Sequence, residues 1–202
     1  MLASALQKIL APALFLSLAA TPVAGGETSA EALKQQIQQR SQNIKEFRAL
    51  LNDPDQTVRL AALDTMLKSD DVAMRELAYG VCFNSADQAM RVICLKNRFG
   101  DLRTVVISIK GIDNPTENQE KVLNEWNGTY SFEVSDYDEK TGQFTTTGTY
   151  VQGKGQVTGT GIEFSQQYCN GGFQLVDGGT MEGELGCRSR WAGTYRGSIR
   201  LQ

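Results

Sequence analysis

Three arginines spaced 16 residues apart have the chemistry to hold an anion. They stand in a repeated phrase, Asp55-Gln-Thr-Val-Arg59, Asp71-Val-Ala-Met-Arg75 and Asp87-Gln-Ala-Met-Arg91. A row of guanidinium groups can bind a carboxylate or a phosphate through paired hydrogen bonds. Each arginine follows an aspartate by four residues, which is the spacing of an ion pair on one helical face. The pattern therefore favours a structural ladder of Asp and Arg over an anion site.

Four cysteines form two local pairs in the sequence, Cys82 with Cys94 and Cys169 with Cys187. In an exported chain an even count favours disulfides, and the simplest of the three possible connectivities joins each local pair. Tetrahedral zinc sites prefer closer pairs such as Cys-x-x-Cys, and the sequence contains no histidine. We therefore expect two structural disulfides and no bound metal.

Little in the sequence supports catalysis. Without histidine the chain lacks the commonest general base and any nucleophile triad that depends on it. Asp136, Asp138 and Glu139 stand before Gly142 like a fragment of a calcium loop, but the remaining ligands are missing and a hairpin tip is the simpler interpretation. Glycine motifs that bind phosphates or dinucleotides are also missing. We expect no catalytic residue and no cofactor, and thus a protein that is not an enzyme.

A second repeated phrase places two tryptophans and two tyrosines in matching positions. Trp126-Asn-Gly-Thr-Tyr130 recurs as Trp191-Ala-Gly-Thr-Tyr195. Such rings can stack on a sugar or close over a lipid. The alternation of polar and apolar residues puts all four rings on inward faces. Core packing is therefore favoured, and contact with a glycan or lipid is the alternative.

Three further arginines share the polar face of the last predicted strand. Arg190, Arg196 and Arg200 lie opposite its apolar residues. They can meet an acidic ligand, but Glu182 and Glu184 on the preceding strand are available as cross-strand partners. A solvated face with ion pairs is the default expectation.

Helices must position the first set of arginines. Residues 31–51 carry an apolar stripe at helical spacing: Leu33, Ile37, Ile44, Phe47 and Leu51. The stripe can cover the first repeat or pair with another chain as a coiled coil, and covering the repeat is favoured.

The stretch from Leu51 to Leu63 resembles a helix of a HEAT-type repeat, with Asp53 placed as a cap and Pro54 at the first helical position. The resemblance covers about residues 50–99 and implies stacked helices with a ladder of Asp and Arg between neighbours. HEAT units hold two helices in about 40 residues. A period of 16 leaves one short helix per unit, so we expect single-helix units.

Glycine usage divides the chain, since 15 of its 20 glycines lie from Gly128 onward. This distribution predicts a helical first half and a β second half. From Trp126 the alternation and the glycine-containing turns predict six or seven antiparallel strands in a meander, closed as a small barrel or packed as a sandwich. A Gly and a Trp near a strand start resemble lipocalin-type or avidin-type barrels. The fold class is α+β, a short helical-repeat array followed by an antiparallel β meander.

The first residues have the layout of a secretory signal peptide. Lys8 is followed by the apolar run Ile9–Ala20 and by small residues around Ala24. The run is short for a membrane span and Pro12 interrupts it, so a cleaved signal is favoured over a retained anchor. The expected organisation is a signal peptide at 1–24, a helical HEAT-like domain at 27–100, a strand-and-helix connector at 101–125 and a β domain at 126–202.

The charge pattern narrows the possible partners. Residues 27–100 hold ten Lys or Arg and ten Asp or Glu, while residues 101–202 hold nine against thirteen. Neither half is basic, so nucleic acid is not an expected partner, and a membrane is met only through the signal segment before cleavage. We expect a periplasmic or secreted protein-interaction module, an accessory subunit of a cell-envelope complex with a protein partner. The alternative is a periplasmic glycan- or lipid-binding β-barrel protein.

Overall fold

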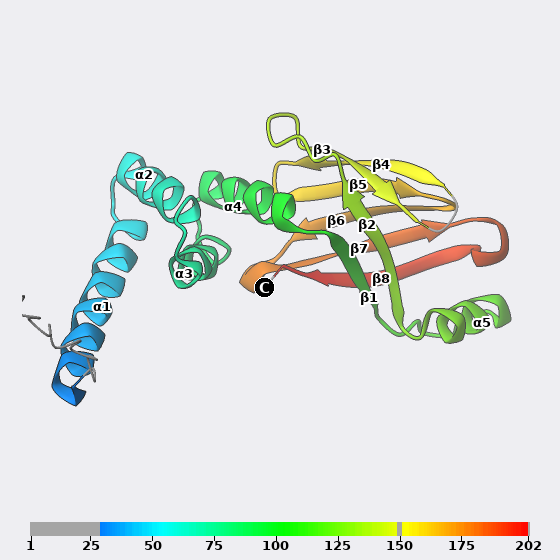
Figure 1. Cartoon of the computed structure of the whole chain (residues 1–202). Coiled ribbons are helices and arrows are strands. Elements are labelled where there is room, and N and C mark those ends of the chain that lie inside the picture. Colours follow the sequence, from blue (N-terminus) through cyan, green and yellow to red (C-terminus); the bar gives the residue numbers. More distant parts are fainter. Residues whose placement is uncertain (1–28, 149–150, 202) are drawn as a thin grey trace, which may run out of the picture. The chain divides into compact units, whose positions relative to one another are not determined.

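The structure of the chain is a computed structural model that describes residues 29–148 and 151–201. The expected signal peptide, residues 1–24, lies outside the described residues. The boundary between two compact units falls between Gln38 and Gln39, within the first helix. Helices form the first part of the second unit, and an antiparallel sheet follows them (Figure 1). The predicted α+β class is confirmed.

Three helices start at the aspartates of the 16-residue phrase. The carboxylates of Asp55, Asp71 and Asp87 accept hydrogen bonds from backbone N–H groups two residues ahead, at 2.8, 2.9 and 3.0 Å. Each aspartate is thus an N-cap, because it accepts a hydrogen bond from an N–H group of the first turn that has no carbonyl partner inside the helix. The helices before the sheet are α1 (Ala30–Leu51), α2 (Gln56–Leu67), α3 (Val72–Cys82) and α4 (Gln88–Asp101).

The start of α2 differs from the prediction. The sequence suggests Asp53 as the cap and Pro54 as the first helical residue, but α2 begins at Gln56. Asp53 Oδ1 accepts a hydrogen bond from the Asp55 N–H at 2.8 Å, which closes a small turn ahead of the helix. The aspartate of the phrase, and not the Asp-Pro pair, therefore sets where the helix starts.

Contacts between helices repeat at twice the period of the sequence. Arg40 donates to Asp71 at 2.8 Å and Gln56 donates to Asp87 at 3.2 Å, and both contacts join residues 31 positions apart. Arg59 reaches the same Asp87 at 2.6 Å. Alternate helices therefore meet at the cap of the later one, because each short turn redirects the chain. These contacts join α1 to α3 and α2 to α4, and the expected HEAT-like array of single-helix units stays a prediction.

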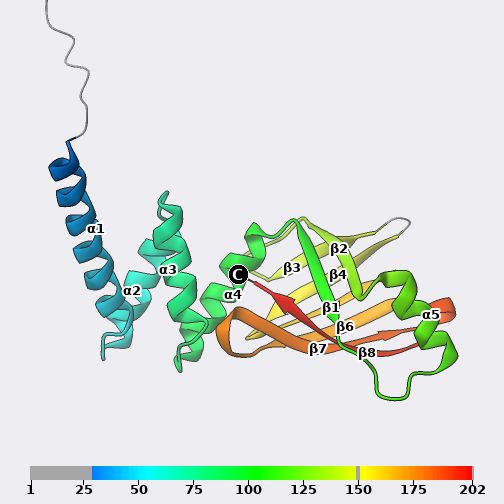
Figure 2. The ribbon, with the colours of Figure 1, turned by 90° about the horizontal axis from the view of Figure 1, so that it is seen from below.

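In the described residues, eight antiparallel strands form a closed barrel in which each strand pairs with the next and β8 pairs with β1 (Figures 1 and 2). The predicted meander is confirmed, and it closes as a barrel rather than a sandwich. The segment expected as a connector supplies β1, where Ile107 lies between Tyr130 of β2 and Ile199 of β8. The strands are β1 (Thr104–Ile109), β2 (Thr129–Ser135), β3 (Gln143–Thr147), β4 (Gln152–Thr158), β5 (Gly161–Gln166), β6 (Cys169–Leu175), β7 (Thr180–Cys187) and β8 (Gly193–Arg200).

Aromatic rings and glycines fill the interior of the barrel. The rings of Phe132 and Phe164 lie 4.5 Å apart between centroids. A Cβ atom at Gly155 would overlap the ring of Phe144, and one at Gly171 would overlap the ring of Phe164. These glycines therefore make room for large rings from neighbouring strands. The barrel is a packed core in which rings occupy the centre.

Helices pack at both ends of the barrel (Figures 1 and 2). At one end the Phe99 ring of α4 lies 4.7 Å from that of Phe144, and Arg91 donates to the Leu175 carbonyl at 2.9 Å. At the other end α5 (Glu117–Trp126) brings Trp126 against Tyr130 at the start of β2. We call these the α4 end and the α5 end.

Both expected disulfides are confirmed. The Cys82–Cys94 bond joins the last residue of α3 to α4, and the Cys169–Cys187 bond joins the start of β6 to the end of β7. Disulfides persist in oxidising compartments and are rare where thiols are kept reduced. The two bonds therefore suggest an extracytoplasmic environment.

Candidate functional site

The two copies of the Trp-x-Gly-Thr-Tyr phrase meet at the α5 end of the barrel. Each Trp ends a helical turn, α5 or the 3-10 turn η2 (Ser189–Trp191), and each Tyr enters a strand that pairs with β1. The glycine between them has a positive φ, 72° at Gly128 and 152° at Gly193. Glycine accepts this conformation without strain, so the chain can turn from helix into strand there.

Trp126 is the centre of this aromatic cluster, which consists of Trp126, Tyr130, Trp191 and Tyr195. Its ring lies 5.0 Å from Tyr130, 5.0 Å from Tyr195 and 6.0 Å from Trp191, between centroids. Tyr195 is 0% exposed and Trp191 is 9% exposed, and the Arg190 guanidinium lies 4.8 Å from the Trp191 ring centroid. The rings of the cluster thus pack mainly on one another.

Burial also removes the tyrosine hydroxyls of the cluster from acid–base chemistry near neutral pH. It raises the pKa of Tyr130 to about 12 and raises the pKa of Tyr195, because a phenolate is poorly solvated inside the barrel. The Tyr195 hydroxyl donates to the Trp191 carbonyl at 3.0 Å, and this bond links η2 to β8. Both hydroxyls stay neutral and act as packing groups.

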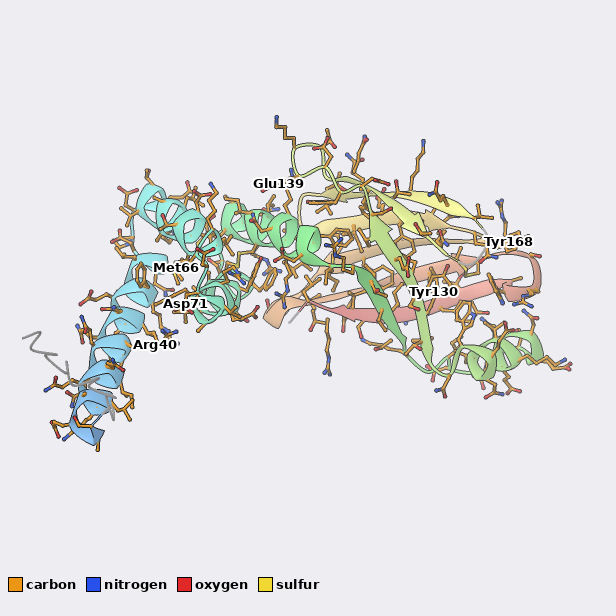
Figure 3. All side chains as sticks on the ribbon, viewed as in Figure 1. Arg40, Met66, Asp71, Tyr130, Glu139 and Tyr168 are labelled. Atoms are coloured by element: carbon orange, nitrogen blue, oxygen red, sulfur yellow. A yellow bond between two sulfur atoms is a disulfide. The ribbon has the colours of Figure 1, made fainter. Side chains whose placement is uncertain are left out.

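Three residues at the α5 end were missed by sequence reasoning. Tyr168 packs edge-on against Trp191 at 5.9 Å (Figure 3 labels Tyr168 and Tyr130 toward this end). Thr146 and Gln166 are buried in the barrel, and the Thr146 hydroxyl donates to Gln166 Oε1 at 2.7 Å. Gln166 follows Ile162 at an even spacing, so the alternation along the strand places it inward. That signal was available in the sequence.

Of the three arginines predicted on the last strand, Arg196 and Arg200 lie on β8, whereas Arg190 lies in η2 ahead of it, because the strand begins only at Gly193. Arg190 donates to Glu125 of α5 at 2.8 Å, and Arg196 donates to Glu184 across the β7–β8 ladder at 3.3 Å. Arg200 is exposed on β8. Arg190 and Arg196 are thus already neutralised, and the three do not form a row of free cations.

The arginines of the 16-residue phrase serve three different contacts. Arg59 binds Asp87 in an ion pair whose side chains are 20% and 8% exposed. Arg75 donates to a carbonyl in the turn before α3 at 2.5 Å, and Arg91 donates to the barrel. The hydrogen bond from Arg59 holds the pKa of Asp87 below its usual range. One arginine joins helices, one closes a turn, and one attaches the helices to the barrel.

The acidic segment between β2 and β3 is a hairpin loop, in which Figure 3 labels Glu139. The Asp138 carboxylate accepts hydrogen bonds from the N–H groups of Thr141 and Lys140, at 3.2 and 2.8 Å, and both lower the pKa of Asp138. Within residues 29–148 and 151–201, no three Asp, Glu, Cys or His side chains gather in a way that would hold a metal ion. The Asp138 carboxylate shapes the loop.

An apolar hollow of about 270 Å³ lies between α1, α2 and α3. Phe47, Met66 and Met74 supply its apolar lining, and Thr65 and Ser69 supply hydroxyl groups (Figure 3 labels Met66). We call it the helical hollow. Phe47, from the apolar stripe predicted on residues 31–51, lines the hollow, but the two methionines of the hollow come from α2 and α3.

Comparison with family models, with curated proteins and with solved structures gave no match. Any functional assignment therefore rests on the residues of this chain. Among the helices that the structure describes, none combines the length and apolar composition of a membrane span.

Proposed function

We propose that this chain is an exported, non-enzymatic protein-interaction module that serves as an accessory subunit of a cell-envelope complex. The observation that carries the proposal is the helical hollow together with exposed apolar side chains on the same helices. Leu50 at the end of α1 is 40% exposed and Val72 at the start of α3 is 59% exposed. Exposed apolar side chains on these helices mark a surface that can bury area against a partner.

The residues of the helical hollow suit a protein partner. Methionine side chains are flexible and polarisable, so Met66 and Met74 can adapt to an inserted apolar side chain. The cap contacts from Arg40 to Asp71 and from Arg59 to Asp87 fix the helices around the hollow. The pairing of alternate helices supports the likeness to HEAT-type repeats, whose stacked helix pairs make extended binding surfaces.

The proposed location is periplasmic or secreted. Two disulfides favour an oxidising compartment. The layout of residues 1–24, with Lys8 ahead of an apolar run, is typical of a cleaved signal peptide. The protein would then contact the membrane only through that segment, before the segment is cleaved.

The alternative, a glycan or lipid held between Trp126 and Trp191, has less support. A ring that binds a sugar needs a free face. Trp191 is almost fully buried against Trp126, Tyr168 and Arg190, and Trp126 packs on both tyrosines of the cluster. These contacts favour a packing role for the aromatic cluster.

Site-specific photo-crosslinking in the native envelope tests the proposal. A photoreactive residue at position 72 is expected to capture a discrete protein, and the same residue at position 106 is the matched control. Val106 is 47% exposed on the outer face of β1 and is similar to Val72 in size and exposure. Equal capture at both positions, or none at position 72, contradicts the proposal.

Two variants complete the test without unfolding the helices. Leu50→Lys places a cation in the last turn of α1, and Val72→Glu places an anion in the first turn of α3, so both charges suit the helix dipole. Each should release the captured protein while the thermal midpoint stays near that of the native chain. The control variant Val106→Glu should still bind the captured protein. A partner that stays bound to both variants rules out the exposed apolar surface of α1 and α3 as its site.

A further inference from the structure

A second hollow, of about 550 Å³, lies on the outer wall of the barrel over β3, β4 and β5. Its volume falls within the roughly 300–1,000 Å³ of small-molecule sites. It lies outside the packed barrel interior, and none of its lining residues belongs to the helical hollow. We call it the wall hollow.

The floor of the wall hollow is polypeptide backbone. Phe144, Gly155 and Phe164 are cross-strand neighbours there, and all three line the hollow. The two phenylalanine side chains point into the barrel and are only 3% and 4% exposed, and Gly155 has no side chain. A ligand therefore meets flat amide groups instead of an apolar surface. Lipid chains and apolar side chains gain little from such a floor.

Two rows of polar side chains border this floor. Gln143, Gln156 and Glu163 are neighbours in register on one side, and Thr145 and Lys154 are neighbours on the other. Carboxamides donate and accept, carboxylates accept, and the ammonium group donates. Both rows point outward and border the same open space, and Gln156 Nε2 also donates to the Thr141 carbonyl at 3.2 Å.

The charges of the wall hollow are available to a ligand. The ion pairs found among the described residues do not include Lys154, Glu163 or Asp136. With two carboxylates and one ammonium group, the lining has an excess of one negative charge. Phosphorylated, sulfated and uronic ligands are therefore disfavoured, because like charges at close range repel.

We propose that the wall hollow binds an oligosaccharide whose sugars are neutral or carry amino groups. Neighbouring sugar hydroxyls both donate and accept, which matches the planar carboxamides of Gln143 and Gln156 and the carboxylate of Glu163. Phe144, Gly155 and Phe164 send no side chain to the outer face, so a sugar ring can lie close to the backbone floor. This site is separate from the helical hollow, so it adds a ligand to the proposed protein partner and does not depend on it.

The test is binding of the mature protein to an immobilised panel of neutral, amino-bearing and acidic oligosaccharides. Neutral or amino-bearing members should bind and acidic members should not. Gln156→Ala and Glu163→Ala should each weaken binding about tenfold, the loss of one good hydrogen bond. Lys154→Ala should tighten binding of amino-bearing members, because it removes the competing cation.

Gln174→Ala on β6 and Glu182→Ala on β7 are matched controls, since both residues are exposed on another part of the barrel wall. They should leave binding unchanged, and the thermal midpoint of each variant checks that the barrel is folded. Three results overturn the proposal: no neutral or amino-bearing member binds, acidic members bind best, or the controls lose as much affinity as Gln156→Ala. Crosslinking at position 72 reports on the protein partner and is independent of each.

Discussion

The three aspartates of the repeated phrase have the same local role and different partners, so replacing each with alanine gives a graded test. Asp55 caps α2. Asp71 caps α3 and binds Arg40, in a pair whose side chains are 35% and 55% exposed. Asp87 caps α4 and binds Arg59 in the pair between α2 and α4, where its own side chain is 8% exposed. The cost of substitution should rise in that order.

Asp55→Ala should lower the free energy of unfolding by about 1 kcal/mol, the usual value of an N-cap. Asp87→Ala removes a cap and also leaves a mostly buried guanidinium without its carboxylate, which costs about 3–5 kcal/mol in comparable pairs. Arg59 keeps hydrogen bonds to the carbonyls of Asp53 and Pro54, so the lower end, about 3 kcal/mol, is expected. Asp71→Ala should fall between the two because the Arg40 pair is largely solvated.

The assay is urea unfolding followed by circular dichroism, with both disulfides intact and the slopes compared between variants. Asp87→Asn is the matched control, because asparagine caps a helix well but carries no charge. The free energy of unfolding should fall in Asp87→Asn by most of the amount that it falls in Asp87→Ala, whereas in Asp55→Asn it should hardly change. If Asp87→Ala loses no more than Asp55→Ala, the ion pair with Arg59 does not hold α2 to α4 and the reasoning fails.

The same pair predicts a pH dependence. The hydrogen bond from Arg59 lowers the pKa of Asp87 in the folded state, whereas an unfolded Asp titrates near about 3.9. Because the pKa of Asp87 is lower in the folded state, its carboxylate stabilises the fold fully at any pH above the unfolded pKa. This contribution is lost as the pH falls through the folded pKa. Below about pH 4 the native chain should therefore lose more stability than Asp87→Asn. Parallel pH profiles for the two chains would falsify this assignment.

Substitutions at a core glycine, at Trp126 and at the barrel disulfide test the packing of the barrel, each measured as a shift in thermal or urea midpoint. Gly155→Ala should destabilise by about 1–3 kcal/mol because its Cβ overlaps a core ring, whereas Gly172→Ala, which meets open space, should be close to neutral. Trp126→Ala should cost about 3 kcal/mol because it removes the centre of the aromatic cluster, and Trp126→Phe should recover part of it. Replacing Cys169 and Cys187 together by serine should cost about 3 kcal/mol and leave partner capture intact.

Features set by near neighbours in the chain could be predicted from the sequence. The helix starts depend on Asp71 and Asp87, whose capping partners lie two residues away, although our sequence interpretation chose Asp53 as the cap of the first repeat. The pairing of Cys169 with Cys187 follows from their place in one β-hairpin, where they are direct cross-strand neighbours. In each case both partners lie inside one local element, so spacing and residue type carry enough information.

Features set by distant contacts could not be predicted. The spacing of four residues between Asp55 and Arg59 suggests a local pair, but Arg59 binds Asp87 from another helix. Two-residue alternation places Tyr130 and Tyr195 inward, and it says nothing about their common contact with Trp126. Strand β1 pairs with both β2 and β8 and so brings these rings together, and the alternation within each strand does not encode that closure.

Strand β1 shows why the connector could not be separated from the β domain. Val105 and Ile107 are buried and Val106 is exposed, the same alternation as in the strands that follow α5. Without β1, strands β2 and β8 would each have an open edge, and the aromatic cluster that they carry would not be brought together. Since β1 follows α4 almost directly and Phe99 of α4 packs on the barrel core, closure of the barrel and attachment of the helices depend on one short segment.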